Sequence, residues 1–205
     1  MKKRYLKSRL NALKYYVYKE TLVNPTEIFW SFLGAFIGIA MISFFQSRFL
    51  FDTDNVFLIG SFAASSVLVF GAIQSPMAQP RNLVLGNFIS AIVGVTVYKI
   101  FPETLWLSAP LSVALSIVIM QLTRSLHPPG GATALIAIIG SEKVKNLGYL
   151  YVFSPVLTGS LILLIVALIF NNLTPERRYP SGHYFTKKIK FFIKSNRIKI
   201  SKLKI

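Results

Sequence analysis

Residues 125–140 read SLHPPGGATALIAIIG and lie between two long apolar runs. The pair Pro128-Pro129 lacks amide hydrogens and the pair Gly130-Gly131 is conformationally loose, so the helix before them must end here. Residues 132–140 contain no breaker before Gly140 and predict a new, short helix. Such a run cannot cross a bilayer, and transporters use interrupted helices of this kind to build substrate sites. We therefore take this stretch as the functional centre.

The composition places this stretch inside a membrane. Of 205 residues, 53% are hydrophobic and 17 are Phe, and the surface of a soluble domain this apolar could not be covered by polar groups. The chain is therefore predicted to be an all-α polytopic membrane protein. It contains no Cys, which excludes a disulfide framework and a thiolate metal site.

Positive charge gathers at the two ends of the chain. The formal net charge is +16, and of the 23 Lys and Arg residues seven lie in residues 1–27 and ten in residues 173–205. Both ends contain basic amphipathic stretches, so we expect them to bind anionic lipid headgroups rather than nucleic acid. The positive-inside rule predicts a multi-pass protein of the inner cell membrane with both termini in the cytoplasm and an even number of crossings.

Six membrane segments follow from the apolar runs. Five are long, and the sixth is the short helix at 132–140 after the Pro-Pro-Gly-Gly break. The long runs cover residues 28–47, 56–73, 83–101, 105–123 and 149–171. The predicted organisation is thus a basic N-terminal segment (1–27), a transmembrane domain (28–172) and a basic C-terminal tail (173–205). The first long run is expected to act as its own signal anchor.

A second break precedes the third long run. Residues 74–82 contain two prolines and Arg81 and cannot continue a helix. A shift of the sequence by 50 residues places Ser75 on Ser125 and aligns the two breaks. This alignment indicates a two-fold internal duplication of span, break and span, with chance identity as the alternative.

Three regions of the sequence, the last of them in two pieces, resemble the HPP family of integral membrane proteins. Residues 127–134 (HPPGGATA) resemble the signature of that family, and residues 79–82 (QPRN), 171–173 (NNL) and 177–180 (RRYP) resemble its other recurrent segments. The resemblance implies a transport role, since cyanobacterial and chloroplast members are regarded as nitrite transporters. Relatives often carry Gly-His where this chain has Gly86-Asn87. If that histidine handles protons in relatives, Asn87 leaves the coupling here open.

The residues around the two breaks indicate an anion independently of the resemblance. A helix that starts inside a protein presents unpaired amides and about half a positive charge at its N-terminus, and glycine lets an anion approach the backbone. Arg81 and Arg124 each stand beside a break, and no acidic residue lies between Asp54 and Glu103 or between Glu103 and Glu142. A cation site would need carboxylates there. The alternative is that both arginines are anchors that reach lipid headgroups.

Eight residues at and near the breaks are the candidate substrate-binding residues. His127 could donate to an anion or carry a proton with it, or it could tie the turn to a backbone carbonyl. Thr133 could offer its hydroxyl to the substrate or bond its own backbone. Small residues at spacing four, such as Gly60 and Ala64 or Gly86, Ser90 and Gly94, are interpreted as helix-packing positions rather than a pore lining. The full set is Arg81, Asn82, Asn87, Arg124, His127, Gly130, Gly131 and Thr133.

The predicted function is a transporter or channel for a small inorganic anion, with nitrite the leading candidate by resemblance alone. The alternative is a membrane scaffold or sensor whose basic ends bind lipid and which transports nothing. An enzyme is not expected, because the two His residues are 56 positions apart and only His127 lies in the membrane domain. Neither a metal nor a cofactor is therefore expected. The sequence leaves homo-oligomerisation open.

Overall fold

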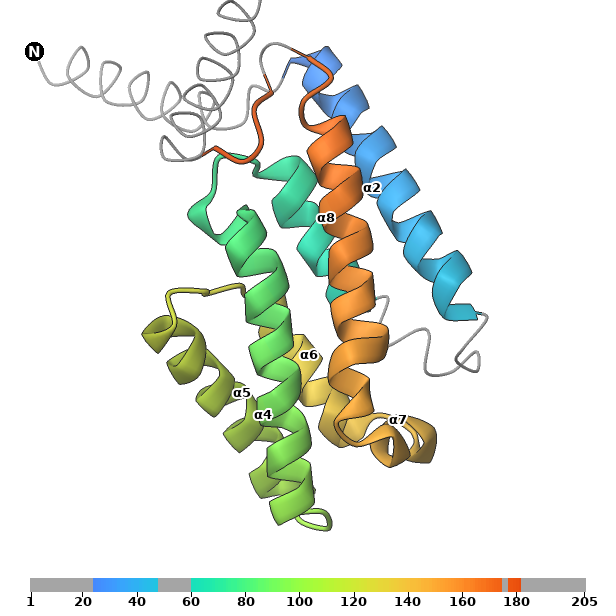
Figure 1. Ribbon diagram of the computed structural model, residues 1–205. Helices are drawn as coiled ribbons and strands as arrows, with labels where there is room; N and C mark the ends of the chain where they lie inside the picture. The colour runs from blue at the N-terminus through green and yellow to red at the C-terminus, as the bar shows by residue number, and fades with distance from the viewer. Residues whose placement is uncertain (1–23, 48–59, 175–176, 182–205) are drawn as a thin grey trace, which may run out of the picture.

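The computed structural model describes residues 24–47, 60–174 and 177–181, and every regular element in these ranges is helical (Figure 1). The prediction of an all-α membrane protein is confirmed for this part of the chain. The predicted basic surface helices near both termini and the loop at 48–55 lie outside the described residues.

Four helices are long and apolar enough to cross a membrane. They are α2 (Pro25–Ser47), α4 (Asn87–Ile100) with the π-helical turn η3 (Asn82–Gly86) before it, α5 (Leu105–Leu122), and α8 (Thr158–Phe170) with the π-helical turn η4 (Val152–Leu157) before it. These four correspond to the first, third, fourth and last of the long runs in the sequence. The described residues therefore do not confirm five long spans.

Two further apolar helices are short, Gly60–Gly71 and α6 (Pro129–Ile139). The predicted run 56–73 is described as a helix only from Gly60, and it ends in the π-helical turn η1 (Val67–Gly71). The helix α6 begins three residues before the predicted start, because proline is well suited to the first position of a helix. At about 1.5 Å per residue, each short helix covers roughly half of a 30 Å hydrocarbon layer.

The two short helices overlap near the middle of the bundle and extend in opposite directions. In Figure 1 the Gly60–Gly71 helix occupies the upper half of the view and α6 the lower half. Ser61 Oγ lies 2.6 Å from Thr133 Oγ1, and Ser65 Oγ lies 2.9 Å from His127 Nε2, so roughly one helical turn is shared. Together the two helices cover the thickness that a single long helix covers elsewhere.

Of the three groups of buried apolar side chains in the described residues, two are large. The first joins α2, the Gly60–Gly71 helix and α8, and its buried members include Ile42, Phe62 and Leu163. The second joins α4, α6 and η4, where Ala91, Ile136 and Val152 are among the buried residues, and α5 packs against α4 and α6. The glycines of α2 belong to the first group. A Cβ on Gly34 would lie 2.6 Å from Phe70 Cδ1, and one on Gly38 would lie 2.9 Å from Leu163 Cδ1, so both glycines permit close packing.

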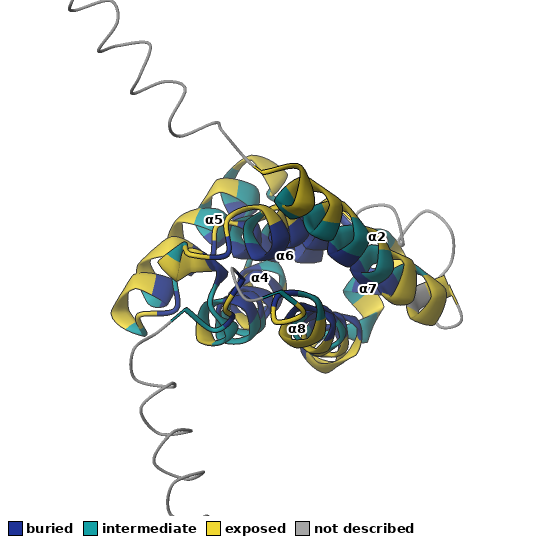
Figure 2. Cartoon of the chain, turned by 90° about the horizontal axis from the view of Figure 1, so that it is seen from above, coloured by how far each residue is buried: buried dark blue, intermediate teal, exposed yellow. Residues whose placement is uncertain are grey.

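The outer surface of the bundle is apolar. Figure 2 shows buried residues concentrated between the helices and exposed residues along the outer faces of α2, α5 and α8. Large side chains on these faces are open, with Trp106 79% and Leu122 78% exposed. Exposure of this much contiguous apolar surface to water is unfavourable, whereas lipid acyl chains can cover it. The chain is therefore a multi-pass membrane protein.

The start of α2, the end of α8 and the first break lie at the same end of the bundle (Figure 1). Arg177 contacts Glu27, and the Tyr179 hydroxyl donates to the carbonyl of Ala78 at 2.7 Å. The opposite end carries the short helix α7 (Glu142–Leu147). This arrangement agrees with an even number of crossings. The assignment of the break end to the cytoplasm stays a prediction.

The internal duplication is not confirmed. The first predicted unit consists of a short helix, a break and a long helix, and the second consists of a long helix, a break and a short helix. Within the described residues the helix lengths therefore run in opposite order in the two units, and residues 56–59 of the first unit lie outside the description.

Candidate functional site

The two breaks contact each other and form one junction, although about 50 residues separate them in the sequence. His127 Nδ1 lies 2.9 Å from the carbonyl oxygen of Met77. Asn82 Nδ2 donates to the carbonyl of Leu126 at 2.7 Å, and Arg81 Nη2 donates to that of Thr123 at 2.6 Å. Carbonyls beyond a helix end have no partner within the helix, so these side chains satisfy groups that would otherwise be unpaired at this depth.

The C-terminal end of α5 explains how the second break turns. The amide of Ser125 donates to the carbonyl of Met120 at 2.8 Å, and the amide of Arg124 donates to that of Gln121 at 3.0 Å. These two bonds form a Schellman motif, which requires a left-handed residue after the helix. Arg124 occupies that position with φ of 53°, where glycine is the usual residue.

His127 is fully buried and its ring bonds on both sides. A carbonyl oxygen can only accept, so Nδ1 carries the hydrogen that is shared with Met77. In the neutral ring Nε2 is then the acceptor, and the Ser65 hydroxyl donates to it at 2.9 Å. In this conformation His127 donates to a main-chain carbonyl, which was one of its two expected roles, rather than facing a site for an anion. That carbonyl belongs to the other break rather than to its own turn.

A chain of hydrogen bonds connects three helices below His127. Asn87 Nδ2 donates to the carbonyl of Leu83 at 2.9 Å, so its oxygen faces Thr133, whose hydroxyl donates to it at 2.9 Å. Thr133 Oγ1 can then accept from Ser61 Oγ, 2.6 Å away. In this arrangement the Thr133 hydroxyl both accepts and donates, so its two bonds polarise each other, and Ser61 Oγ also lies 3.1 Å from the carbonyl oxygen of Pro129. The Tyr151 hydroxyl adds a bond of 2.9 Å to the main-chain carbonyl of Thr133.

We call these buried polar residues the polar seam: Ser61, Ser65, Asn87, His127, Thr133 and Tyr151. None is more than 2% exposed, and none is a carboxylate. The seam lies where the Gly60–Gly71 helix meets α4 and α6. Its neutral hydroxyl, amide and imidazole groups can bind a small polar or anionic solute only if some internal bonds open first, because they are bonded to one another or to main-chain carbonyls.

The two glycines of the central stretch have different surroundings. A Cβ on Gly130 would lie 2.6 Å from Ser90 Oγ, 3.1 Å from Met120 Sδ and 3.2 Å from the Gly86 carbonyl, so this glycine permits close packing of α6 on α4. A Cβ on Gly131 would meet only Val113 of α5, at an ordinary 3.6 Å. The amides of Gly130 and Gly131 donate to the carbonyls of His127 and Pro128. The expectation of unpaired amides at this helix start is therefore wrong for these two residues, because tight turns satisfy them.

The structure groups the predicted site residues at two levels. Arg81, Asn82 and Arg124 lie at the break junction, and both arginines are exposed there. Asn87, His127 and Thr133 lie deeper, in the polar seam. Gly130 faces α4, whereas Gly131 faces α5 and does not contact the seam. The glycines of α4 also serve packing, since a Cβ on Gly94 would lie 2.9 Å from Ala134 Cα of α6.

Sequence reasoning missed Ser61, Ser65 and Tyr151. In the run at 56–73 we chose the small pair Gly60 and Ala64 as the contact positions, but both are exposed. The contact face is one position further along, where Ser61 and Ser65 are again spaced by four. Inside a membrane, a serine hydroxyl is stabilised by a hydrogen bond to a neighbouring helix, whereas a glycine has no side-chain group to bond. The two serines at spacing four were therefore the signal in the sequence for the contact face.

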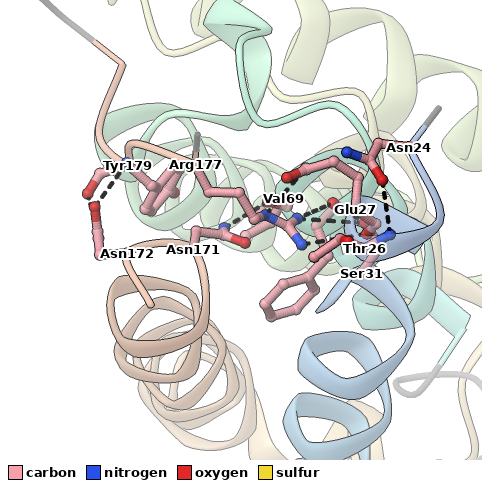
Figure 3. A network of polar contacts seen from close by, with 10 residues as sticks. Asn24, Thr26, Glu27, Ser31, Val69, Asn171, Asn172, Arg177 and Tyr179 are labelled. Atoms are coloured by element: carbon pink, nitrogen blue, oxygen red, sulfur yellow. Dashed lines mark hydrogen bonds and ion pairs between the residues drawn. The ribbon is translucent and has the colours of Figure 1, made fainter. Parts of the chain in front are cut away.

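A segment after α8 completes the break end of the bundle (Figure 3). We call residues 177–181 the C-terminal strap. Arg177 is 2% exposed and donates through Nη2 to the carbonyl of Phe70 at 2.8 Å, and its Nε lies 3.5 Å from a Glu27 carboxylate oxygen. Asn171 Nδ2 donates to the carbonyl of Val69 at 2.8 Å. The unpaired carbonyls at the end of the Gly60–Gly71 helix are thus capped by a cation and an amide. The packed body therefore extends beyond the expected boundary at residue 172.

Comparisons with known proteins identify relatives of this chain. The family model described as "HPP, transmembrane region" matches residues 20–180. Two curated proteins of Dictyostelium discoideum, each named only as a transmembrane protein, are 48% and 46% identical over 157 residues, which is 75% of this chain. The match covers 50% of one relative and 55% of the other, so the chain spans about half of their length. No solved structure matches the chain.

Proposed function

The chain belongs to the HPP transmembrane family, and from this membership and the polar seam we propose that it transports a small inorganic anion. The observation that carries the proposal is the seam itself, a set of neutral hydrogen-bond donors buried between apolar helices. A hydroxyl or imidazole hydrogen suits an anion, whereas a metal cation would need carboxylate or several carbonyl oxygens. An ionisable side chain inside a membrane bundle, here His127, is rare and usually marks a functional site.

The break junction supplies the entrance in this proposal. Arg81 and Arg124 are exposed there, and the acidic residue described at that end, Glu27, is paired with Arg177. The positive potential of the two arginines would raise the local concentration of anions at the mouth. An anion that leaves the arginines then meets the seam, where it replaces the internal bonds between Ser65, His127 and Thr133 one after another.

The conformation described here is closed, because the seam bonds are made within the protein. The Gly60–Gly71 helix meets α6 through hydroxyl contacts at Ser61 and Ser65. Opening between these two short helices would expose the seam donors without disturbing the apolar groups on either side. We place the pathway at this contact.

Uptake of anions into proteoliposomes tests the proposal. The purified full chain is reconstituted, and uptake of nitrite, nitrate, formate, chloride and phosphate is measured with and without a pH gradient. Nitrite is the first candidate because of the resemblance noted in the sequence. Uptake of at least one anion above that of protein-free liposomes supports transport. No uptake of any of the five contradicts the proposal and favours the scaffold alternative.

Arginine variants test the entrance. Arg81→Gln should lower uptake several-fold, because a charge-assisted contact in a partly dry cavity is stronger than a neutral one, and Arg81→Lys should retain more because it keeps the point charge. Arg178→Gln is the matched control, since Arg178 is an exposed arginine on the strap at the same end. Equal uptake by the parent and both Arg81 variants would make Arg81 an anchor rather than part of the entrance.

A further inference from the structure

The C-terminal strap contacts the first break beside the residue that holds His127. The Tyr179 hydroxyl donates to the carbonyl of Ala78 at 2.7 Å, and the Ser181 amide donates to Gln79 Oε1 at 2.8 Å. The preceding carbonyl, that of Met77, is the one that His127 Nδ1 contacts at 2.9 Å. The strap and His127 therefore bind adjacent main-chain carbonyls of the short turn η2 (Pro76–Ala78).

The first break is otherwise held by the bonds of Arg81 and Asn82 to the second break. It consists of the single 3-10 turn η2, with prolines at positions 76 and 80, and it cannot form a regular helix. The Gln79 side chain is the link inside it, because Nε2 donates to the carbonyls of Ile73 and Ser75 at 2.9 Å each. The strap thus orients the glutamine that shapes the break.

There is also space beside the break. A cleft of about 360 Å³ is lined by residues 70–75 together with Glu27, Ser31 and Arg177. On this side the break faces open volume rather than packed side chains, so it can shift without the removal of a helix from the core. The contacts that oppose a shift include the bond of Arg177 to the Phe70 carbonyl, in the network of Figure 3, and the bond of Tyr179 to the Ala78 carbonyl.

We propose that the C-terminal strap is a latch on the polar seam. With Arg177 on the Phe70 carbonyl and Tyr179 on the Ala78 carbonyl, the first break stays in the position where Met77 binds His127, and water is excluded from Ser65 and His127. Release of the strap lets the break move toward the cleft, frees His127 from Met77 and admits water to the seam. This inference rests on the proposed function only in taking the seam as the solute pathway.

The position of the strap in the chain fits this role. It follows the last long helix directly, and Asn172 fixes its middle through two bonds to the main chain of Tyr179, at 2.7 Å to the carbonyl and 3.1 Å from the amide. The strap is therefore anchored to α8 at one point and to the break at another. A movement of the chain on either side of the strap would be transmitted to the break through Tyr179.

Cysteine labelling measures the latch without any substrate. The chain has no Cys, so Ser65→Cys introduces a single thiol next to His127. The protein is placed in nanodiscs, where both faces are open, and the rate of reaction with N-ethylmaleimide is measured. In the otherwise unchanged chain the thiol should react slowly, because Ser65 is fully buried. Ser125→Cys, also fully buried and next to the second break, serves as an independent reporter.

Strap variants should speed the labelling. Tyr179→Phe removes the bond to Ala78 and should raise the rate by roughly five- to tenfold, the change in opening equilibrium expected from one lost buried hydrogen bond. Ser181→Pro removes the donor to Gln79 and should act in the same direction, and it serves if Tyr179→Phe does not fold. Tyr149→Phe is the matched control, because that tyrosine hydroxyl lies 3.1 Å from Thr96 Oγ1 at the opposite end of the bundle.

The outcomes separate the latch from the transport proposal. Faster labelling in the strap variants and not in Tyr149→Phe supports the latch, even if no anion is transported. Unchanged labelling in both strap variants, or an equal increase in Tyr149→Phe, overturns the latch, even if anion uptake is found. The labelling therefore decides one proposal and the uptake panel decides the other.

Discussion

The hydroxyl of Thr133 on α6 donates to the side-chain oxygen of Asn87 on α4 at 2.9 Å, and neither residue is more than 1% exposed. This bond joins two helices that otherwise pack closely through small and apolar residues such as Ala91, Gly94 and Ala137. It also sets the direction of the whole chain from Ser61 to Leu83, since the Asn87 amide group has already given a hydrogen to Leu83. Asn87 therefore determines the direction of the hydrogen bonds in this part of the polar seam.

Replacement of Asn87 by Leu should destabilise the protein. The substitution leaves the buried Thr133 hydroxyl without its acceptor and should lower the free energy of unfolding by about 1–3 kcal/mol. Unfolding of the purified protein by titration of a denaturing detergent measures the change.

A double-mutant cycle separates this bond from the loss of packing. If the bond is the cause, Thr133→Val should destabilise less in the Asn87→Leu background than in the parent, with a coupling of about 0.5–3 kcal/mol. Additive effects of the two substitutions would show that Asn87 and Thr133 act independently, contrary to the geometry.

Gly130 and Gly131 should respond differently to alanine. Gly130→Ala places a methyl group against Ser90 and Met120 and should destabilise by about 1–3 kcal/mol, the range for an overpacked core. Gly131→Ala finds an ordinary contact with Val113 and should be neutral or stabilising by up to about 1 kcal/mol, because alanine is the better helix former. Thermal unfolding of the two variants compares neighbouring positions directly. Equal losses would refute the assignment of the two faces of α6.

The tautomer of His127 is a further prediction. Because Met77 offers a carbonyl, the neutral ring should carry its hydrogen on Nδ1, and Nε2 should be a hydrogen-bond acceptor. Nitrogen-15 NMR of the ring in a His183→Gln background, which leaves one histidine, distinguishes the two tautomers. Ser65→Ala should shift the Nε2 signal and leave Nδ1 nearly unchanged. A hydrogen found on Nε2 in the neutral ring would be inconsistent with the junction described here.

Arg124 should be replaceable by glycine with a gain in stability. Its φ of 53° disfavours a residue with a Cβ, so Arg124→Gly should stabilise the fold by about 1 kcal/mol. Arg124→Ala removes the same charge and keeps the Cβ, and it should bring no such gain. If the charge serves the entrance, both variants should take up less anion. A stabilised Arg124→Gly with parental uptake would assign the arginine a role outside transport.

The sequence predicted the parts of the fold that depend on local chemistry. Two prolines close together disfavour a continuous helix, so the breaks near Pro76 and Pro128 were recognisable without a structure, whereas the single Pro110 lies inside α5. The run at 132–140 was too short to span for the same local reason. The site residues at the break junction followed from these positions.

The remainder depends on contacts that leave no local pattern. Inside a membrane both the buried and the lipid-facing sides of a helix are apolar, so hydrophobic periodicity does not show which face packs, and the choice between Gly60 and Ser61 could not be made. The bond between Tyr179 and Ala78 joins residues about 100 positions apart. The charge count predicted a basic tail. It could not predict the burial of Arg177, because that burial depends on a bond to the carbonyl of Phe70, which is far away in the sequence.

The close approach of α4 and α6 at Gly94 and Gly130 has a mechanical consequence. Where main chains touch, with Gly94 against Ala134, two helices cannot slide without a steric collision, so α4 and α6 would move as one rigid body. The Gly60–Gly71 helix faces this body through the hydroxyls of Ser61 and Ser65, which can exchange partners with water at small loss. In any gating movement of this protein, the Gly60–Gly71 helix would therefore slide along that hydroxyl face, while α4 and α6 stay fixed relative to each other.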